Sequence, residues 1–373
     1  MTDQTRELPA ERPLGQVEEV AHFHGAMPTG VTVSHGGRIF VNYPKWGDDV
    51  EYTVAEVVDG EAVAYPNREI NRSDPDNLAG TLVSVQSVVV DPANRLWILD
   101  TGSPLFQPTE YGGPKLVCVD LGTDTVVRTI LFPTDVALPT SYLNDVRFDL
   151  RRGREGIAYL TDSSDRGPNG IVVADLASGE SWRRLQDHPS TKAEGLSDFV
   201  PVVEGRPVVE RRPDGSVGAA IAMGSDGIAI GSDGARLYYC PLAGRRLYSV
   251  ATDALVDRSL DDGEVAATVT DEGDKGGAGD GLESDAAGHV YATNYEHNAV
   301  LRWASGSNGA WETVAHDPRL LWPDTLSLAT DGYLYVTANQ LHRQADYQNG
   351  EDLRVKPYTL FRIRVDAEPV LLR

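Results

Sequence analysis

The chain has 373 residues, with 33 Lys and Arg against 56 Asp and Glu, so its formal net charge is −23. Its apolar fraction of 41 % is ordinary for a globular protein and excludes extensive disorder. The acidic balance argues against a nucleic-acid partner and against an anionic membrane surface, because both need a basic face. At about 100–200 residues per domain, the length allows up to three domains or one large barrel.

The chain shows no sign of targeting to a membrane or of secretion. It has no apolar run of ~18 residues or more, and residues 1–15 lack the apolar stretch of a secretory signal. A cytoplasmic location is therefore expected. Cys118 and Cys240 lie inside the apolar runs 116–121 and 237–242, which predicts two buried free thiols.

One pattern recurs six times: a short β-like segment, a turn with Gly, Asn or Asp, and an apolar segment with an aromatic anchor. In chain order the copies are GVTVSHGGRIFV (30–41), SVVVDPANRLWIL (87–99), DVRFDLRRGREGIAYLT (145–161), GIAIGSDGARLYYC (227–240), GLESDAAGHVYAT (281–293) and TLSLATDGYLYVT (325–337). The anchors are Phe40, Trp97, Tyr159, Tyr238, Tyr291 and Tyr335, spaced by 57, 62, 79, 53 and 44 residues.

Each copy is typical of a β-hairpin, because apolar residues alternate and the turn residues tolerate unusual backbone angles. Further strand-like runs follow the hairpins, at 52–58, 116–121, 126–131, 170–175, 247–250, 265–270, 300–304 and 358–365. Hairpin plus partners makes a four-stranded antiparallel blade. Six such units predict an all-β, six-bladed β-propeller.

The ring has to close, because an open ring exposes two sheet edges. The early run at 17–23 precedes the first hairpin, and the run at 358–365 follows the sixth. We therefore predict that the N-terminal strand completes the last blade beside the C-terminal strand. Residues 1–13 are then a tail, and residues 14–373 form one propeller domain.

Polar residues precede the first strand of most blades, at positions that face one mouth of the central channel. Alone, each such residue is typical of a turn or cap. Together they predict a shared polar site that holds a cation, a polar small molecule or water. The positions that carry Gln, Asn or Asp are Gln86, Asn144, Asp226, Asp280 and Asp324.

Three of these residues are candidate acids and bases. If Asp226, Asp280 and Asp324 lie close together, the pKa of at least one carboxyl is raised toward neutral pH, which suits proton transfer. His297, on a loop after the fifth hairpin, is a further candidate base, although a structural loop histidine is the simpler interpretation.

Other residues are candidate ligand contacts around the same mouth. Trp322 and Tyr43 are aromatic side chains that can stack on a ligand, and Trp322 lies next to Pro323-Asp324. Asn294 and Asn339 follow the second strands of the last two blades, where a side-chain amide can bind a polar group. Gln86 and Asn144 complete the predicted set of ligand-binding residues.

Several stretches resemble the major royal jelly protein and yellow family, most closely its unsecreted bacterial branch. They include YLNDVRFD (142–149), SDGIAI (225–230), LYYCPLAGRRLYSV (237–250), GGAGDGLESD (276–285), YATNYEHNAVLRW (291–303) and DPRLLWPDTLSL (317–328), in matching order. The resemblance spans about residues 14–366 and implies a six-bladed propeller. The family includes insect proteins linked to dopachrome conversion and amine-binding proteins.

A more distant resemblance is to the senescence marker protein and gluconolactonase family, whose propellers hold a divalent cation with a Glu, two Asn and an Asp. By position, Asn144 and Asp226 match one Asn and the Asp, so this resemblance implies them as metal ligands. The first-blade Glu is absent, since Met27-Pro28-Thr29-Gly30 stands there, and Gln86 occupies the second-blade position. Only half of the ligand set for a cation such as Ca²⁺ is present.

Three hypotheses follow. The first is a propeller that binds a small aromatic or amine-bearing molecule at the channel mouth and acts on it as a tautomerase or isomerase. The second is a metal-dependent, lactonase-like hydrolase. The third is a non-catalytic binding or scaffold propeller. The sequence favours an enzyme, names no substrate and leaves the oligomeric state open.

Overall fold

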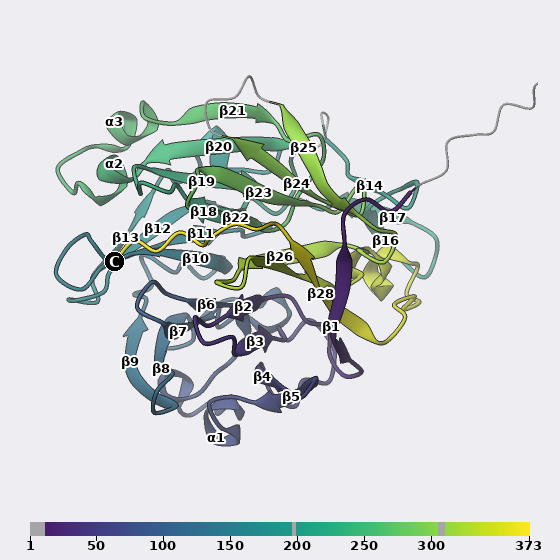
Figure 1. The fold of residues 1–373 in the computed structure, drawn as a ribbon, viewed down its shortest axis with the longest axis horizontal. Coiled ribbons are helices and arrows are strands. Elements are labelled where there is room, and N and C mark those ends of the chain that lie inside the picture. Colours follow the sequence, from purple (N-terminus) through teal and green to yellow (C-terminus); the bar gives the residue numbers. More distant parts are fainter. Residues whose placement is uncertain (1–11, 196–198, 305–309) are drawn as a thin grey trace, which may run out of the picture.

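The computed structural model describes residues 12–195, 199–304 and 310–373. Six four-stranded antiparallel sheets form a ring in this part of the chain, which confirms the predicted six-bladed β-propeller (Figure 1). The innermost strands gather around the centre of the ring, and the outermost strands lie at its periphery. We call the end at which each innermost strand begins the upper end, and the opposite end the lower end.

Blades 1 to 3 follow one another along the chain. Blade 1 consists of β2 (Val31–Val33), β3 (Ile39–Asn42), β4 (Val54–Val58) and β5 (Glu61–Ala64). Blade 2 consists of β6 (Val85–Val90), β7 (Arg95–Asp100), β8 (Lys115–Asp120) and β9 (Thr125–Leu131). Blade 3 consists of β10 (Leu143–Asp149), β11 (Ile157–Asp162), β12 (Gly170–Asp175) and β13 (Ser181–Arg184).

Blades 4 to 6 complete the ring. Blade 4 consists of β18 (Ser225–Ile230), β19 (Arg236–Pro241), β20 (Arg246–Ala251) and β21 (Thr270–Asp274). Blade 5 consists of β22 (Leu282–Ser284), β23 (His289–Asn294), β24 (Ala299–Ala304) and β25 (Trp311–His316). Blade 6 consists of β26 (Pro323–Leu328), β27 (Tyr333–Ala338), β28 (Tyr358–Arg364) and β1 (Val17–Phe23).

Blade 6 closes the ring as predicted. Strand β1 pairs antiparallel with β28, with Val17 opposite Ile363 and Phe23 opposite Tyr358. The N-terminal strand is therefore the outermost strand of the last blade. This arrangement ties the two ends of the ring together through a sheet ladder, and β28 is not left as an unpaired outer edge.

The repeated turn and aromatic anchor of the sequence pattern form one structural unit. In blade 2 the Asp91 carboxylate accepts the turn N–H groups of Ala93 and Arg95 and, at 2.9 Å, the indole N–H of Trp97. In blades 5 and 6, Asp285 and Asp331 accept the hydroxyl groups of the corresponding tyrosine anchors, each at 2.9 Å. The turn aspartate thus locks the hairpin and satisfies the polar atom of the buried aromatic ring.

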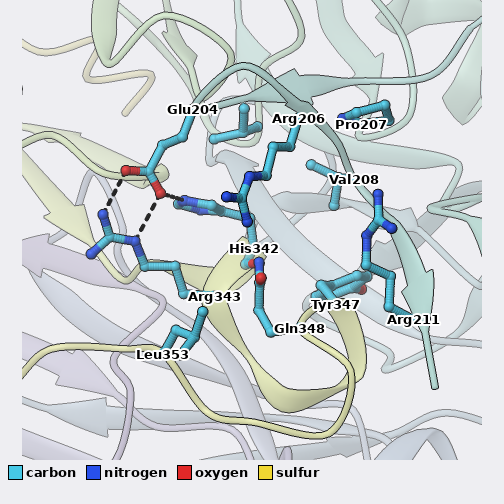
Figure 2. Close-up of a pocket in the computed structure, with 11 residues that line it drawn as sticks. Glu204, Arg206, Pro207, Val208, Arg211, His342, Arg343, Tyr347, Gln348 and Leu353 are labelled. Atoms are coloured by element: carbon cyan, nitrogen blue, oxygen red, sulfur yellow. Dashed lines mark hydrogen bonds and ion pairs between the residues drawn. The ribbon is translucent and has the colours of Figure 1, made fainter. Parts of the chain in front are cut away.

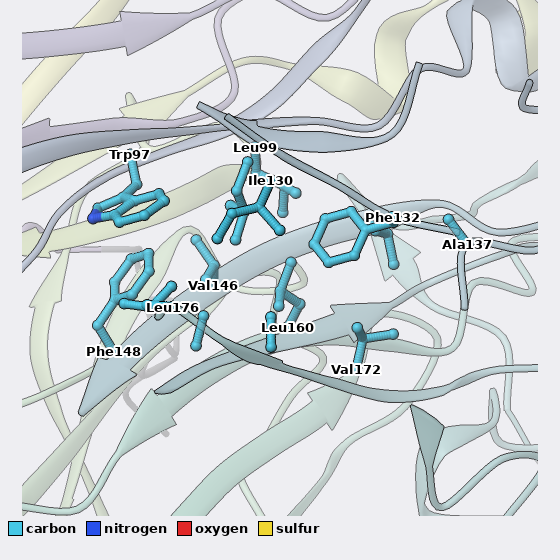
Figure 3. Close-up of a cluster of buried hydrophobic side chains, with 14 of the residues drawn as sticks. Trp97, Leu99, Ile130, Phe132, Ala137, Val146, Phe148, Leu160, Val172 and Leu176 are labelled. Atoms are coloured by element: carbon cyan, nitrogen blue, oxygen red, sulfur yellow. The ribbon is translucent and has the colours of Figure 1, made fainter. Parts of the chain in front are cut away.

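Hydrophobic cores lie between neighbouring blades. Figure 3 shows the core between blades 2 and 3, where Trp97 stacks on Phe148 with ring centroids 5.2 Å apart and Leu160 and Val172 lie beneath Ile130. All six predicted anchors are buried, with exposed fractions of 5 % or less. Both cysteines are free and buried, as predicted.

The C-terminal tail crosses the lower end of the ring and ends there (Figure 1). The backbone carbonyl of Leu372 accepts the Leu150 N–H at 2.9 Å, and Arg373 donates to the Pro92 carbonyl on blade 2. The Leu372 side chain is buried in the core between blades 3 and 4. The tail therefore connects blades 2, 3 and 4, from which it is distant in sequence, and it covers the lower mouth of the channel.

Insertions distinguish the upper end. Two small hairpins, β14 (Val202–Val203) with β15 (Arg206–Pro207) and β16 (Val209–Arg211) with β17 (Val217–Ala220), separate blades 3 and 4. They account for the long spacing between the third and fourth anchors. They lie at the same end of the molecule as the loop after β27 (Figure 1). That loop carries the short helical turns η4 (Leu341–Arg343) and η5 (Ala345–Tyr347).

Helices are few and short. They are α1 (Arg68–Asn71), α2 (Thr252–Val256) and α3 (Asp262–Ala266), with the 3-10 turns η1 (Leu78–Gly80), η2 (Pro104–Phe106) and η3 (Pro189–Thr191). The run 265–270, predicted as a strand, belongs largely to α3 and its exit. A capping box between Asp261 and Glu264 starts a helix there, so the outermost strand β21 begins only at Thr270. Among the described residues, no helix is long and apolar enough to cross a membrane.

Candidate functional site

Four of the five polar residues predicted at the channel mouth lie in β-bulges of the innermost strands. In β6, β10, β18 and β26 the pairing register shifts at the upper end, and the shifted segments contain Gln86, Asn144, Asp226 and Asp324. A β-bulge leaves a residue unpaired and turns its side chain away from the regular pleat. The same irregularity in four blades therefore directs four polar side chains toward the axis.

Glycines allow the bulged strands to come close to one another. A Cβ atom on Gly227 would lie 2.3 Å from the carbonyl oxygen of Asp280. A Cβ atom on Gly281 would lie 2.4 Å from the carbonyl oxygen of Asp324, which accepts the Gly281 N–H at 2.8 Å. No other residue fits at such a separation. The two Asp-Gly pairs thus place neighbouring aspartates side by side.

Threonines on the second strands support these bulges. The Thr293 hydroxyl accepts the N–H of Asp280 at 2.9 Å, and the Thr337 hydroxyl accepts the N–H of Thr325 at 3.2 Å. The Thr161 hydroxyl donates to the carbonyl oxygen of Asp226 at 2.6 Å. These contacts satisfy backbone groups that the bulges leave without a ladder partner.

Asp226, Asp280 and Asp324 form a cluster at the axis, which we call the axial aspartates. They are 3 %, 7 % and 4 % exposed. Asp226 and Asp280 are hydrogen-bonded to each other. Asn144 donates its amide to Asp226, and Asn339 donates to Asp324 at 2.5 Å. The structure therefore brings together five of the residues predicted from the blade pattern.

Burial raises the pKa of all three axial aspartates, because a low-dielectric environment disfavours the charged form. The nearby carboxyls of Asp280 and Asp324 add to the rise in the pKa of Asp226. The pKa of Asp280 rises to about 6, since hydrogen bonds from Trp322 and Asp226 offset part of the burial effect. Burial and the neighbouring carboxyls thus favour the protonated form of Asp226, whereas hydrogen bonds to Asp280 favour its charged form.

The axial aspartates have no ion-pair partner in the part of the chain that the structure describes. Among the ion pairs of the described residues, none joins a Lys, Arg or His to an axial aspartate. The nearest cation toward the lower end is already used, because Arg147 pairs with Asp145 at 2.9 Å and lies 3.9 Å from Glu283. The axial aspartates are thus an acidic centre whose charge is neutralised by protons or by a bound group.

Aromatic side chains enclose the cluster on two sides. On one side, Trp46 and Phe106 stack with ring centroids 5.6 Å apart, and the Trp46 indole donates to the Tyr142 hydroxyl at 2.8 Å. The Tyr142 hydroxyl in turn donates to Gln86 at 2.9 Å. The carboxyls of Asp226 and Asp324 add to the burial effect that raises the Tyr142 pKa, which places this ring beside the cluster.

The other side consists of stacked rings. Trp322 is fully buried, donates its indole N–H to Asp280 at 2.8 Å and stacks on Tyr295 with centroids 4.1 Å apart. His342 covers its other face at 5.8 Å. Both faces are therefore occupied, and this ring is not free to stack on a ligand in the present arrangement. Its positive φ of 55° shows that the surrounding structure holds it in an unfavourable backbone conformation.

Three predicted residues lie outside the cluster. Tyr43 is buried in the core between blades 6 and 1, where it contacts Phe23 and Tyr52 at 5.9 Å each. His297 is exposed on the outer rim, and no hydrogen bond of the described residues joins it to an axial aspartate. Asn294 is buried at the end of β23 against Gly277, with its Oδ1 unpartnered.

Only part of the cluster has the chemistry of a metal centre. Carboxylate and amide oxygens suit a hard cation such as Ca²⁺, and Asn144 and Asp226 are in direct contact. However, no group of three or more His, Cys, Asp or Glu within residues 12–195, 199–304 and 310–373 is arranged to hold a metal ion. Asn144 also turns its N–H, not its oxygen, toward Asp226. The arrangement therefore does not fit a metal centre.

Sequence reasoning named Trp322 of the aromatic enclosure but missed Tyr142, Phe106 and the supporting threonines. Tyr142 directly precedes the third inner strand, and its loop is held by Asp162, which accepts the Tyr142 N–H at 2.9 Å. A signal was present, since Thr161, Thr293 and Thr337 occupy the same place in three of the repeats.

Comparison with known proteins gives the family. A family model described as major royal jelly protein matches residues 83–364. Protein yellow of Drosophila melanogaster is 29 % identical over 252 residues, which cover 63 % of this chain and 42 % of that protein. Protein yellow of Drosophila erecta is also 29 % identical over 252 residues. The aligned region thus spans less than half the length of these relatives.

Solved structures with the same fold are far more distant in sequence. A luciferin-regenerating enzyme matches with a TM-score of 0.58 and 12 % identity, covering 97 % of this chain and 100 % of that chain. A calcium-binding regucalcin from Agrobacterium tumefaciens matches with a TM-score of 0.56 and 15 % identity, covering 95 % and 98 %. A gluconolactonase from Xanthomonas campestris matches with a TM-score of 0.54 and 12 % identity, covering 96 % and 98 %. These likenesses show the propeller fold alone, whereas the family match shows that the chain belongs to the major royal jelly protein family.

Proposed function

We propose that the protein binds a small amine-bearing, partly aromatic molecule at the axial aspartates and transfers a proton on it, as a tautomerase or isomerase. The observation that carries the proposal is a set of three buried carboxyls with no cationic partner among the described residues. A buried charge needs a partner of opposite sign. A ligand ammonium group supplies that partner, and the rings of Tyr142 and Trp46 suit an aromatic body.

The chemistry follows from the unequal protonation of two neighbours. With a pKa of about 6, Asp280 serves as the base at neutral pH, and Asp226 beside it, whose pKa is raised by burial, serves as the acid. A base and an acid in contact can remove a proton from one position of a ligand and return one at another. Asp324, held by Asn339 and Thr325, is the third carboxyl of the cluster and offers a further hydrogen-bond partner to the ligand.

The buried position of the aspartates means that a ligand reaches them only when a side chain of the enclosure moves. Phe106 is the most suitable, because it is only half-buried and lies on the loop η2, next to Trp46. A closed enclosure excludes water, which strengthens the interactions of the carboxyls with a bound ion. A cytoplasmic location remains part of this proposal.

The test is solvent-deuterium incorporation, followed by NMR, into a panel of aromatic amines and dopachrome-like quinones. The matched variants are Asp226→Asn and Asp280→Asn, with the exposed Asp135→Asn as control. We expect each axial variant to lower the exchange rate at least about a hundredfold, a magnitude typical of general acid–base catalysis, and Asp135→Asn to leave it unchanged. Exchange that is equal in all four proteins would exclude these carboxyls as the acid and base.

The metal-dependent, lactonase-like hydrolase expected from the sequence is tested beside this proposal, although the Asn144 amide N–H rather than its oxygen faces Asp226. Elemental analysis of the purified protein separates the two. Stoichiometric calcium together with chelator-sensitive lactone hydrolysis would replace the first proposal. A metal-free protein whose deuterium exchange survives chelator supports it. Tight binding of an amine without turnover would favour the non-catalytic binding propeller.

A further inference from the structure

A cavity separate from the axial aspartates lies at the upper end. It has a volume of about 340 Å³ and lies between the hairpins β14–β17 and the loop that carries η4 and η5 (Figure 2). This volume is within the range of about 300–1,000 Å³ that small-molecule sites occupy. His342 and Trp322 separate the cavity from Asp280, since His342 stacks on Trp322, which holds Asp280.

The cavity is basic, although the protein as a whole is strongly acidic. Arg206, Arg211 and Arg343 line it, and Glu204 is the one carboxylate of its lining. Glu204 is fully used: it accepts from Arg343 at 2.8 Å and from His342 at 2.7 Å (Figure 2). Arg206 and Arg211 form no ion pair with any residue that the structure describes. Two guanidinium groups are thus left over for a ligand.

The buried imidazole adds a second observation. His342 is 4 % exposed, its Nε2 faces Glu204, and its Nδ1 is buried without a hydrogen-bond partner within the described residues. Buried polar atoms in proteins are usually paired, so the unpaired nitrogen beside this cavity calls for a partner that a bound molecule would supply. Val208 and Leu353 supply apolar surface in the same cavity.

From these features we propose that the cavity binds a small organic carboxylate, with the carboxylate held by Arg206 and Arg211 and the apolar body against Val208 and Leu353. Guanidinium groups bind carboxylates through paired, charge-assisted hydrogen bonds, which makes arginine the residue suited to this role. The site is independent of the proposed function at the axial aspartates and takes a ligand of opposite charge.

The test uses two probes that match in size and differ in charge, 3-phenylpropanoate and 3-phenylpropanamide, with the full chain and calorimetric titration. We expect the carboxylate to bind at least about tenfold more tightly than the amide, as befits a charge-assisted contact at a site open to solvent. Inorganic phosphate at equal ionic strength should compete at least about tenfold more weakly than the carboxylate, because it lacks an apolar body.

The variants Arg206→Gln and Arg211→Gln should each weaken binding of the carboxylate about tenfold and leave binding of the amide unchanged. Arg72→Gln is the matched control, since Arg72 is exposed and follows α1, in the connection between blades 1 and 2. Thermal unfolding checks that each variant is folded. Equal binding of the two probes, or an equal loss in Arg72→Gln, would overturn the assignment. Equal competition by phosphate would overturn the part that assigns an organic ligand.

Discussion

Replacing Asp280 by Asn should make the protein more resistant to rising pH. The pKa of Asp280 rises from its ordinary value of 3.8 to about 6 on folding, so the folded state binds this proton more tightly than the unfolded state. The stabilisation from this proton is complete below the unfolded pKa and is lost as the pH rises through the folded pKa. Each tenfold change in proton affinity is worth about 1.4 kcal/mol, so the full loss is about 3 kcal/mol.

The Asn variant has no such proton to lose, and its amide oxygen can still accept the Trp322 N–H. The difference in free energy of unfolding between variant and wild type should therefore rise by about 2 kcal/mol between pH 4.5 and 7.5, the share of the total that falls in this window. Urea unfolding followed by circular dichroism measures it, with Asp135→Asn as the control that should show no trend. A difference that stays flat within about 0.5 kcal/mol would refute the raised pKa.

Three further substitutions test the fold that positions the site. Leu372→Ala should lower the free energy of unfolding by about 2–4 kcal/mol, because it empties part of the core between blades 3 and 4. In the same urea experiment, Leu371→Ala should lower it by less than about 0.5 kcal/mol, because Leu371 is 40 % exposed. Asp100→Asn should lower the free energy of unfolding by about 3–5 kcal/mol, because it leaves Lys115 buried without its partner at 2.8 Å. Removing Asp271 from its exposed pair with Arg246 should lower it by less than about 1 kcal/mol. Gly227→Ala should destabilise the protein and abolish the high carboxyl pKa values together, because its Cβ would meet the Asp280 carbonyl at 2.3 Å; an alanine variant with unchanged titration would contradict the close approach.

The architecture could be predicted from the sequence because each blade repeats one local pattern. Alternating apolar residues and a turn with Gly, Asn or Asp define each hairpin, and the number of repeats defines the ring. The closure by β1 followed from the need to pair a sheet edge. The small hairpins β14–β17 could not be predicted in this way, because they belong to no repeat and lie on the surface of the upper end.

The candidate site could be predicted only in part, for a similar reason. Asp226, Asp280 and Asp324 were found because they occupy one place in successive repeats, whereas Tyr142 and Trp46 lie in loops whose course depends on tertiary contacts. Tyr43 illustrates the opposite case: it follows a hairpin at the upper end, but Phe23 of the closing strand packs against it and holds it in the core. The position of Tyr43 after a hairpin therefore did not determine the direction of its side chain.

The protonation state of the axial aspartates tests the central claim most directly. Carbon-13 NMR of the aspartate carboxyls, assigned with the three single Asn variants, measures it across the pH range. We predict that Asp280 titrates near pH 6 and that Asp226 and Asp324 remain protonated above that pH, because burial and mutual proximity raise the pKa of each. If all three carboxyls titrated near their ordinary value of 3.8, the cluster would not be a proton-transfer site.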